Sequence, residues 1–252
     1  MTAPDHNEVV KRSFTRQVHL FSGPDSIFAE RAVSAVSWIE PLSPEMIVLD
    51  VACGAAHVSE PLAPLVRQIV GVDLTRALLD LAAARLRGQN VRNVLLQEAN
   101  AEALPFLDES FDIVFCRSSL HHFGDAQRAV AEMARVCREG GRVVLMDLVA
   151  PSEEERELFD HVHRLLDPSH VRTFLEPELA ALAPGELRYA NTAPIRMPID
   201  VAITEQSDRA EIERLLHADV DGSGESTGFD PALEDGKLVV SFTSCVVHAA
   251  RD

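Results

Sequence analysis

The sequence predicts an α/β fold in which a mostly parallel sheet has helices on both faces. Helix-period and strand-period patterns alternate through residue 150, as such a fold requires. An apolar run at 47–49 suits a strand that is covered on both faces, and the turn after it contains Gly54. A second apolar strand ends at Asp73, about twenty residues beyond that glycine, which is the spacing of a βαβ unit that binds a nucleoside.

Five strands with helices between them are expected to form the parallel part of the sheet. The strands are predicted at 46–51, 68–73, 93–98, 111–116 and 142–148, and the helices at 57–66, 75–87 and 126–138. Thr75 is the expected N-cap of the second helix, and Gly88 or Asn90 can end that helix in a left-handed turn. Because crossovers between parallel strands are right-handed, the helices are expected on both faces of the sheet.

The C-terminal part of the chain has a different pattern. Residues 152–183 are helical and charged at first and are then interrupted by prolines, so we expect short helices that lie over the sheet as a lid. Two strand-like stretches are then predicted, at 187–203 and 237–249. Between them we expect a helix at 207–219 and a flexible loop at 221–228.

The turn after the first strand indicates which nucleoside cofactor binds. A pyrophosphate needs close backbone approach at several points, and a dinucleotide fingerprint has glycine at three positions. Here these positions are Ala52, Gly54 and Ala56, so NAD is disfavoured. S-adenosylmethionine (SAM) carries no phosphate and suits a turn with one glycine, with Asp73 accepting hydrogen bonds from its ribose hydroxyls. The alternative interpretation is an ordinary strand, turn and helix with Asp73 on the surface.

The segments after this turn occur in a known order. They are EANAEALPF at 98–106, DESFDIVFCR at 108–117, LHHF at 120–123 and GGRVVL at 140–145. Together with the turn they resemble the class I SAM-dependent methyltransferases, in particular the branch of the ubiquinone/menaquinone C-methyltransferases (methyltransferase type 11). The resemblance covers 48–147, and it is specific because separated motifs keep the order and spacing of the family.

The resemblance implies a Rossmann-like, seven-stranded, mostly parallel sheet with an antiparallel C-terminal hairpin strand and a small helical lid. The length indicates one domain over 1–252. We expect an N-terminal helical arm at 1–40 and a cofactor-binding core at 41–150. The lid is expected at 151–186, and the C-terminal strands and helix at 187–252. The residues that the resemblance assigns to SAM, with S-adenosylhomocysteine as product, are Asp50, Ala52, Gly54, Asp73, Leu74, Asn100, Ala101, Glu102 and Arg117.

Two glycines and one aspartate of the family pattern are replaced in this chain. The family reads DVGCGTG where this chain has DVACGAA at 50–56, so Ala52 and Ala56 each add a methyl group beside the cofactor. We expect weaker cofactor binding rather than its loss, provided that these positions do not need a positive φ. Asn100 stands where the family commonly has Asp, and its amide still offers a donor and an acceptor to the adenine edge.

Methyl transfer to an OH, NH or acidic CH group requires a base. His121 and His122 follow the fourth predicted strand at the C-terminal end of the sheet, where open α/β sheets bind ligands, and we favour His122. The alternative is that either imidazole packs or caps the next helix. Asp112, near the start of that strand, is expected to be a structural cap.

Contacts with the substrate or the lid are assigned to four residues. Phe14 and Phe21 in the N-terminal arm can fold over the pocket, and the alternative is that they anchor the arm to the core. His170 and Arg172 in the predicted lid can contact substrate, and the alternative is a solvated helix.

No metal site is expected. His161 and His163 are two residues apart, so they point in different directions on a helix. The four cysteines, Cys53, Cys116, Cys137 and Cys245, form no Cys-x-x-Cys pair. Cys53 lies in the turn and the other three lie in apolar surroundings, which favours a reduced, cytoplasmic protein.

Composition narrows the function further. A formal charge of −17 without clustered Lys or Arg argues against binding RNA or DNA. No segment is apolar for about 18 residues, and the first residues lack the pattern of a signal peptide, so no membrane span is expected. The predicted function is methyl transfer from SAM to a small-molecule acceptor, at carbon or oxygen of a quinone-like compound or natural product, by a monomer or homodimer. The alternative is a catalytically altered or inactive SAM-binding protein.

Overall fold

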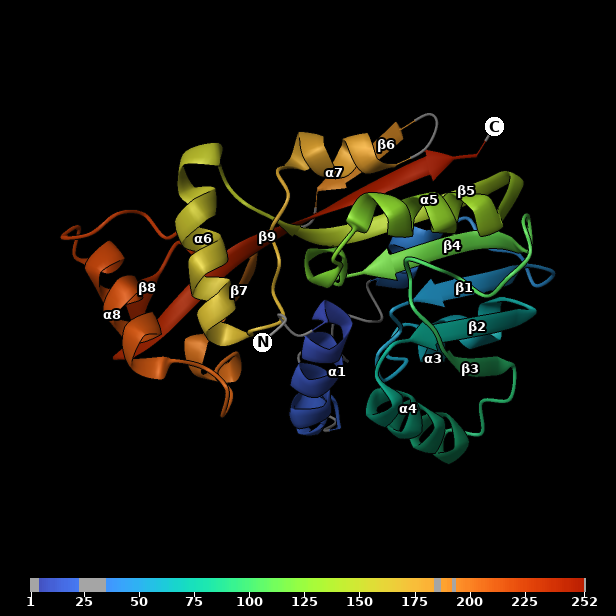
Figure 1. The fold of residues 1–252 in the computed structure, drawn as a ribbon, viewed down its shortest axis with the longest axis horizontal. Coiled ribbons are helices and arrows are strands. Elements are labelled where there is room, and N and C mark those ends of the chain that lie inside the picture. The colour runs from blue at the N-terminus through green and yellow to red at the C-terminus, as the bar shows by residue number, and fades with distance from the viewer. Residues whose placement is uncertain (1–4, 23–34, 184–186, 192–193, 252) are drawn as a thin grey trace.

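The computed structural model describes residues 5–22, 35–183, 187–191 and 194–251. The parallel strands are β1 (Ile47–Val51), β2 (Gln68–Asp73), β3 (Val94–Glu98), β4 (Phe111–Arg117) and β5 (Cys137–Val149). The other strands are β6 (Leu187–Asn191), β7 (Ile195–Pro198), β8 (Ala232–Glu234) and β9 (Lys237–Ala250). Seven strands follow one another across the sheet in the order β3-β2-β1-β4-β5-β9-β6, which confirms the predicted fold class (Figure 1).

The predicted parallel strands are all present, with one difference in length. β5 begins at Cys137 rather than at 142, because Cys137 pairs with Phe111 before a bulge shifts the register to Ile113 and Arg142. In the centre of the sheet, Asp50 of β1 lies between Gly71 of β2 and Phe115 of β4. The carboxyl ends of these strands therefore meet at one edge, as the nucleoside-binding motif requires.

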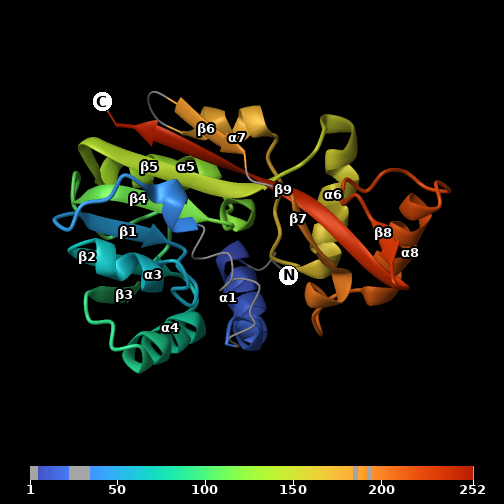
Figure 2. The ribbon, with the colours of Figure 1, turned by 180° about the vertical axis from the view of Figure 1, so that it is seen from behind.

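Helices cover both faces of the parallel part. α5 (Ala126–Val136) and α7 (Glu176–Leu182) pack on one face, and α3 (Ser59–Leu62) and the helical residues 35–39 pack on the other (Figures 1 and 2). The expected helix at 57–66 is shorter than predicted and continues as the 3-10 helix η2 (Ala63–Leu65). Pro64 explains the change, because it has no N–H to donate to the carbonyl four residues earlier.

The helix α4 (Arg76–Gly88) packs beside β2 and β3, and its ends follow the sequence signals only in part. Thr75 occupies the N-cap position, but its side chain makes no capping bond; its backbone N–H donates to Asp73 Oδ1 at 2.7 Å instead. At the other end Gly88 stays helical, and Asn90 takes the left-handed conformation with a φ of 56°. The left-handed ending is therefore at Asn90.

β9 extends beyond the parallel part and carries a second packing unit. Its second half pairs antiparallel with β5 and β6, and its first half pairs with β7 and β8. The helices α6 (Glu153–Leu166) and α8 (Arg209–Val220) pack with these short strands around a core that includes Phe159, Ile212 and Phe229. β8 and β9 form a hairpin that the sequence analysis did not predict, and it turns at Asp235 and Gly236, both with positive φ, as a two-residue hairpin loop needs.

The expected strand at 187–203 is not continuous. It divides into β6 and β7, and the 3-10 helix η4 (Ile199–Val201) follows β7. Pro198 ends β7 because proline cannot donate a hydrogen bond to the next strand.

The N-terminal arm lies between the two parts of the molecule. It consists of α1 (His6–Gln17), capped by the Asp5 side chain, and the 3-10 helix η1 (Val18–Phe21) (Figures 1 and 2). Among the described residues, no helix is both long and apolar enough to cross a bilayer.

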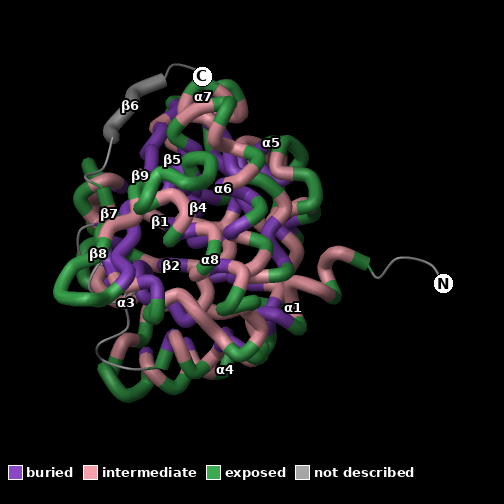
Figure 3. Tube along the Cα trace, turned by 90° about the vertical axis from the view of Figure 1, so that its left-hand side faces the viewer, coloured by how far each residue is buried: buried purple, intermediate pink, exposed green. Residues whose placement is uncertain are grey.

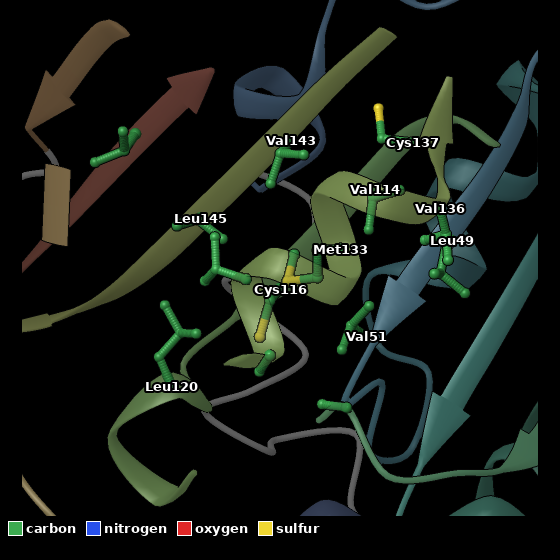
Figure 4. Close-up of a cluster of buried hydrophobic side chains, with 14 of the residues drawn as sticks. Leu49, Val51, Val114, Cys116, Leu120, Met133, Val136, Cys137, Val143 and Leu145 are labelled. Carbon is green, nitrogen blue, oxygen red and sulfur yellow. The ribbon is translucent and has the colours of Figure 1, made fainter. Parts of the chain in front are cut away.

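Buried residues follow the strands and the inner faces of the helices, while the outer turns are exposed (Figure 3). In the main core Met133 of α5 contacts the side chains that β1, β4 and β5 turn towards that face (Figure 4). Met133 has no exposed surface, whereas the side chain of Leu107 is among the most exposed apolar ones in the described chain, at 83%.

We expect Met133→Ala to lower the free energy of unfolding by about 2–5 kcal/mol, because it removes buried methylene groups and leaves a cavity. Leu107→Ala is the control and should change it by less than about 0.5 kcal/mol. Urea unfolding followed by circular dichroism measures both. An equal effect of the two substitutions would contradict the packing of α5 described above.

Candidate functional site

A cavity of about 590 Å³ opens at the carboxyl ends of the parallel strands. One end of it, the acidic end, contains all nine residues that the sequence assigned to the cofactor: Asp50, Ala52, Gly54, Asp73, Leu74, Asn100, Ala101, Glu102 and Arg117. We call the other end the apolar chamber. Its walls come from α6, β7, η4, β9 and a loop, and the residues that line it are Leu166, Ile195, Met197, Ile199, Val201, Ala202, Phe229, Val240 and Phe242. The sequence motifs located the first end and gave no indication of the second.

The turn after β1 has an unusual backbone. Ala52, Gly54 and Ala56 all have positive φ, at 56°, 54° and 58°. We expected alanine to be tolerated at these positions only if their φ was negative. Both alanines have a positive φ, so this condition is not met. A left-handed conformation costs a residue with a Cβ roughly 1–2 kcal/mol, so both alanines hold strain that glycine would not.

Asp73 holds this turn in place. Its Oδ2 accepts a hydrogen bond from the Gly54 N–H at 2.8 Å, and its Oδ1 accepts one from the Thr75 N–H at 2.7 Å. Burial raises the pKa of Asp73, and these backbone donors oppose the rise. Asp73 also lines the cavity, so its carboxylate lies within reach of a ligand there.

Asp50 lies beside Asp73 at the acidic end and accepts a hydrogen bond from the Ser59 hydroxyl at 2.6 Å. Burial raises its pKa to about 7, although Ser59 and the charge of Arg117 lower it. Arg117 is the only Lys or Arg among the described residues that line the cavity. This end is therefore suited to a cationic group and poorly suited to phosphates.

Two further predicted cofactor residues also shape the loop around the cavity. Asn100 Oδ1 accepts a hydrogen bond from the Glu102 N–H at 2.9 Å. Glu102 Oε1 accepts one from the Asp125 N–H at 2.9 Å, just before α5. Both side chains thus support the loop that they line.

His121 is paired with a carboxylate that the sequence analysis did not assign. Its Nδ1–H donates to Asp147 Oδ1 at 2.5 Å, and its backbone N–H donates to Oδ2 at 3.2 Å. Burial lowers the pKa of His121, but the charge and hydrogen bond of Asp147 outweigh burial and raise it. Asp147 lies on β5 beside the end of β4, so the shared edge of two parallel strands was the signal that could have identified it.

His122, which the sequence analysis favoured as the base, has a different environment. Its Nδ1 lies 3.1 Å from the Ser169 hydroxyl, which itself donates to Asp167 Oδ1 at 2.7 Å. Ser169 therefore accepts from His122, and Nδ1 carries the proton. Burial and the neighbouring His121 lower the pKa of His122 to about 3, which makes it a weak base.

The arm helix α1 closes the cavity above these histidines. Ser13 and Gln17 donate to Asp167 at 2.7 and 2.9 Å, and Phe14 packs edge-on against His122. Phe14 and Phe21 both line the cavity, and Phe21 is also buried against Ala55 and Leu78. The two interpretations of these phenylalanines, pocket wall and core anchor, therefore describe the same contacts.

Neither lid residue proposed for substrate contact lines the cavity. His170 is buried, and its Nε2 donates to Asp160 at 2.8 Å. Arg172 points outward and pairs with Glu178 at 2.8 Å. Among the described residues of the predicted lid, only α6 and the residue after it reach the cavity, while α7 packs on β5 and β9. Asp112, in contrast, is structural as expected, because it accepts from the Ile47 N–H at 2.6 Å.

Comparisons with known proteins agree with this geometry. The sequence profile of the family described as "Methyltransferase domain" matches residues 49–145. YcgJ of Bacillus subtilis, an uncharacterized methyltransferase, is 40% identical over 154 residues, which cover 60% of this chain and 61% of YcgJ. Demethylmenaquinone methyltransferase of Desulfitobacterium hafniense is 33% identical over 58% of this chain and 58% of its own length. The chain thus matches about three fifths of these curated relatives.

Solved structures extend the similarity beyond the matched segment. The crystal structure of YcgJ has a TM-score of 0.77 at 29% identity and covers 88% of this chain and 99% of YcgJ. Phosphoethanolamine N-methyltransferase 2 of Haemonchus contortus, solved in complex with SAM, has a TM-score of 0.66. It covers 100% of this chain and 61% of its own, at 17% identity, which shows a shared fold alone.

We expect Ala52→Gly to raise the free energy of unfolding by about 1 kcal/mol, because glycine adopts the positive φ of this position without strain. Ala55→Gly is the matched control. Ala55 is buried and has no positive φ, so its loss should lower stability by about 1 kcal/mol. Chemical denaturation of both variants tests this, and destabilisation by Ala52→Gly would contradict strain at the turn.

Proposed function

We propose that this chain, which matches the methyltransferase domain over residues 49–145, transfers a methyl group from SAM to a small-molecule acceptor. One observation carries this proposal. The turn held by Asp73 and the imidazole of His121, backed by Asp147, line the same cavity. A nucleoside site and a base for the acceptor are thus part of one enclosed space.

The acidic end fits SAM in charge and in shape. A Cβ built at Gly54 would meet no other atom within 4 Å, so this point of the turn is open to a ligand. Asp73 lines the cavity and would accept from the ribose hydroxyls, and the carboxyl group of Asp50 beside it would favour the positively charged part of SAM. With Arg117 as the only Lys or Arg among the described lining residues, a dinucleotide phosphate would lack charge partners.

Bound SAM supplies a methyl group that its sulfonium already makes reactive. The protein then has to orient the acceptor, exclude water and remove a proton. His121 suits the last task because Asp147 holds its Nδ1–H, which leaves Nε2 to take a proton from the acceptor. We therefore assign the base to His121, and give His122 the role of packing α1 over the site.

The apolar chamber indicates the kind of acceptor. Its walls are aliphatic and aromatic, so the bulk of the acceptor should be apolar, with its acidic group near His121. A quinone-like carbon acid or a natural-product hydroxyl has this character. The similarity to a demethylmenaquinone methyltransferase supports the first of these.

A second candidate function is binding of SAM without methyl transfer. The observation that favours it is the strain at Ala52 and Ala56, where the family has glycine. Release of S-adenosylhomocysteine from SAM in the presence of phenols, naphthols and hydroquinones separates the two. Release with any acceptor supports the transferase, and SAM binding without release across the panel supports the alternative.

We expect Asp73→Ala to weaken SAM binding by about one to two powers of ten, because each charge-assisted hydrogen bond contributes about 1.5–3 kcal/mol. The control is Asp80→Ala, which removes an exposed carboxylate of α4 that pairs with Arg76. Isothermal titration calorimetry measures both affinities, and circular dichroism checks that Asp73→Ala is folded. Unchanged affinity in a folded Asp73→Ala protein would refute the assignment.

We expect His121→Gln to lower kcat by about 100- to 10,000-fold, the range typical of a lost general base, with SAM affinity nearly unchanged. In the wild type kcat should rise with pH through the raised pKa of His121, since the base must be neutral. Asp147→Asn removes the charge that raises this pKa, so the rise should move to lower pH.

His161→Gln is the matched control, because His161 is exposed on α6. A pH profile that Asp147→Asn leaves in place would contradict the role of the pair. So would a His121→Gln enzyme that keeps its rate.

A further inference from the structure

A polar side chain that the proposed reaction does not use lies beside the apolar chamber. His163, on the last turns of α6, lines the cavity together with Phe229 and Leu166. Its imidazole stacks on the ring of His170, with centroids 4.9 Å apart and planes 18° apart, and packs 4.8 Å from the ring of Phe229. These contacts hold the ring in a single orientation.

The two nitrogens of His163 have different roles. Nδ1–H donates to the carbonyl of Phe159 at 3.0 Å, one turn back along α6. Nε2 makes no hydrogen bond with any residue that the structure describes. Burial and the charges of His170 and His121 keep the pKa of His163 well below its ordinary value. The ring is therefore neutral, and Nε2 is an acceptor that can receive a hydrogen bond but cannot donate one.

The neighbours of His163 fix this state. The ring of His170 lies between the rings of His121 and His163, with centroid distances of 5.5 and 4.9 Å. His170 is itself held by Asp160, which also accepts from the Thr173 N–H at 2.7 Å. His121 and His163 thus flank one buried ring, and both border the cavity.

Nε2 of His163 faces the cavity without a partner among the described residues, so a ligand that supplies a donor gains a hydrogen bond there. A site built around such a group discriminates strongly against ligands that lack the matching donor. The nine residues that define the apolar chamber offer no side-chain acceptor, and His163 lies beside two of them, Leu166 and Phe229, so it can receive a second donor of a ligand held there.

We propose that His163 is a specificity-determining residue, which selects apolar acceptors that carry a second O–H or N–H group besides the one facing His121. The part of this inference that concerns His121 rests on the proposed function. The favoured ligands are dihydroxy or aminohydroxy aromatic compounds, and their mono-ethers and oxidised, carbonyl forms are disfavoured.

Binding to the protein saturated with S-adenosylhomocysteine tests this without any turnover. The probes are isomers of dihydroxynaphthalene, each compared with its own monomethyl ether by isothermal titration calorimetry. We expect at least one diol to bind wild type about tenfold more tightly than its ether, equivalent to about 1.4 kcal/mol. In His163→Phe, which keeps an aromatic ring but no acceptor, this ratio should fall to within about twofold of unity. His163→Gln can place an amide oxygen near the position of Nε2 and should restore part of it.

The inference is overturned if wild type binds no diol more tightly than its ether, or if His163→Phe keeps the preference. A general loss of folding would weaken diol and ether equally, and partial rescue by His163→Gln excludes it. Release of S-adenosylhomocysteine from SAM with the same probes tests the proposed function separately. A diol preference without release of S-adenosylhomocysteine contradicts only the proposed methyl transfer. Release without a diol preference contradicts only the proposed role of His163.

Discussion

The site depends on the two backbone hydrogen bonds that Asp73 accepts. They join the turn after β1 to the start of α4, since Gly54 donates to one oxygen and Thr75 to the other. A carboxylate bonded in this way orders the turn before any ligand binds, and it also lines the cavity where hydroxyl donors of a ligand can reach it. The same bonds oppose the rise in pKa that burial causes, so the charge that attracts a cationic cofactor also stabilises the loop that receives it.

Burial gives four neighbouring histidines different chemistry. His121 has a carboxylate directly on Nδ1, and its pKa is raised despite burial. His122 meets its carboxylate only through Ser169, and its pKa is lowered. His170 has Asp160 as partner, but burial and the charge of His121 still lower its pKa. His163 is bonded to a carbonyl and stays neutral. His121 is therefore the member of the cluster whose pKa favours accepting a proton.

The sequence predicted the half of the site that comes from local motifs. Every residue assigned to the cofactor lines the cavity. In a βαβ unit the strand ends fix where the glycine turn and the carboxylate about twenty residues later lie, so these motifs locate the site. The positive φ at Ala52 and Ala56 could not be read from the chain, since alanine normally avoids this region. Asp147 was within reach of sequence reasoning, as it lies near the end of a predicted strand. Asp167 and His163 were not, because their roles arise from how α6 packs across the cavity.

The apolar chamber was beyond prediction for a related reason. Its walls come from β7, η4 and β9, and the sequence showed 187–203 as one strand. Proline at 198 ends β7, and the chain then turns over the cavity. β9 pairs with β5 through one half and with β7 through the other, so a single strand belongs to both parts of the molecule. The position of the chamber relative to His121 is therefore set by the continuity of one strand rather than by loop contacts. Such a wall can hold an apolar acceptor at a constant distance from the base, which is what transfer of a single carbon requires.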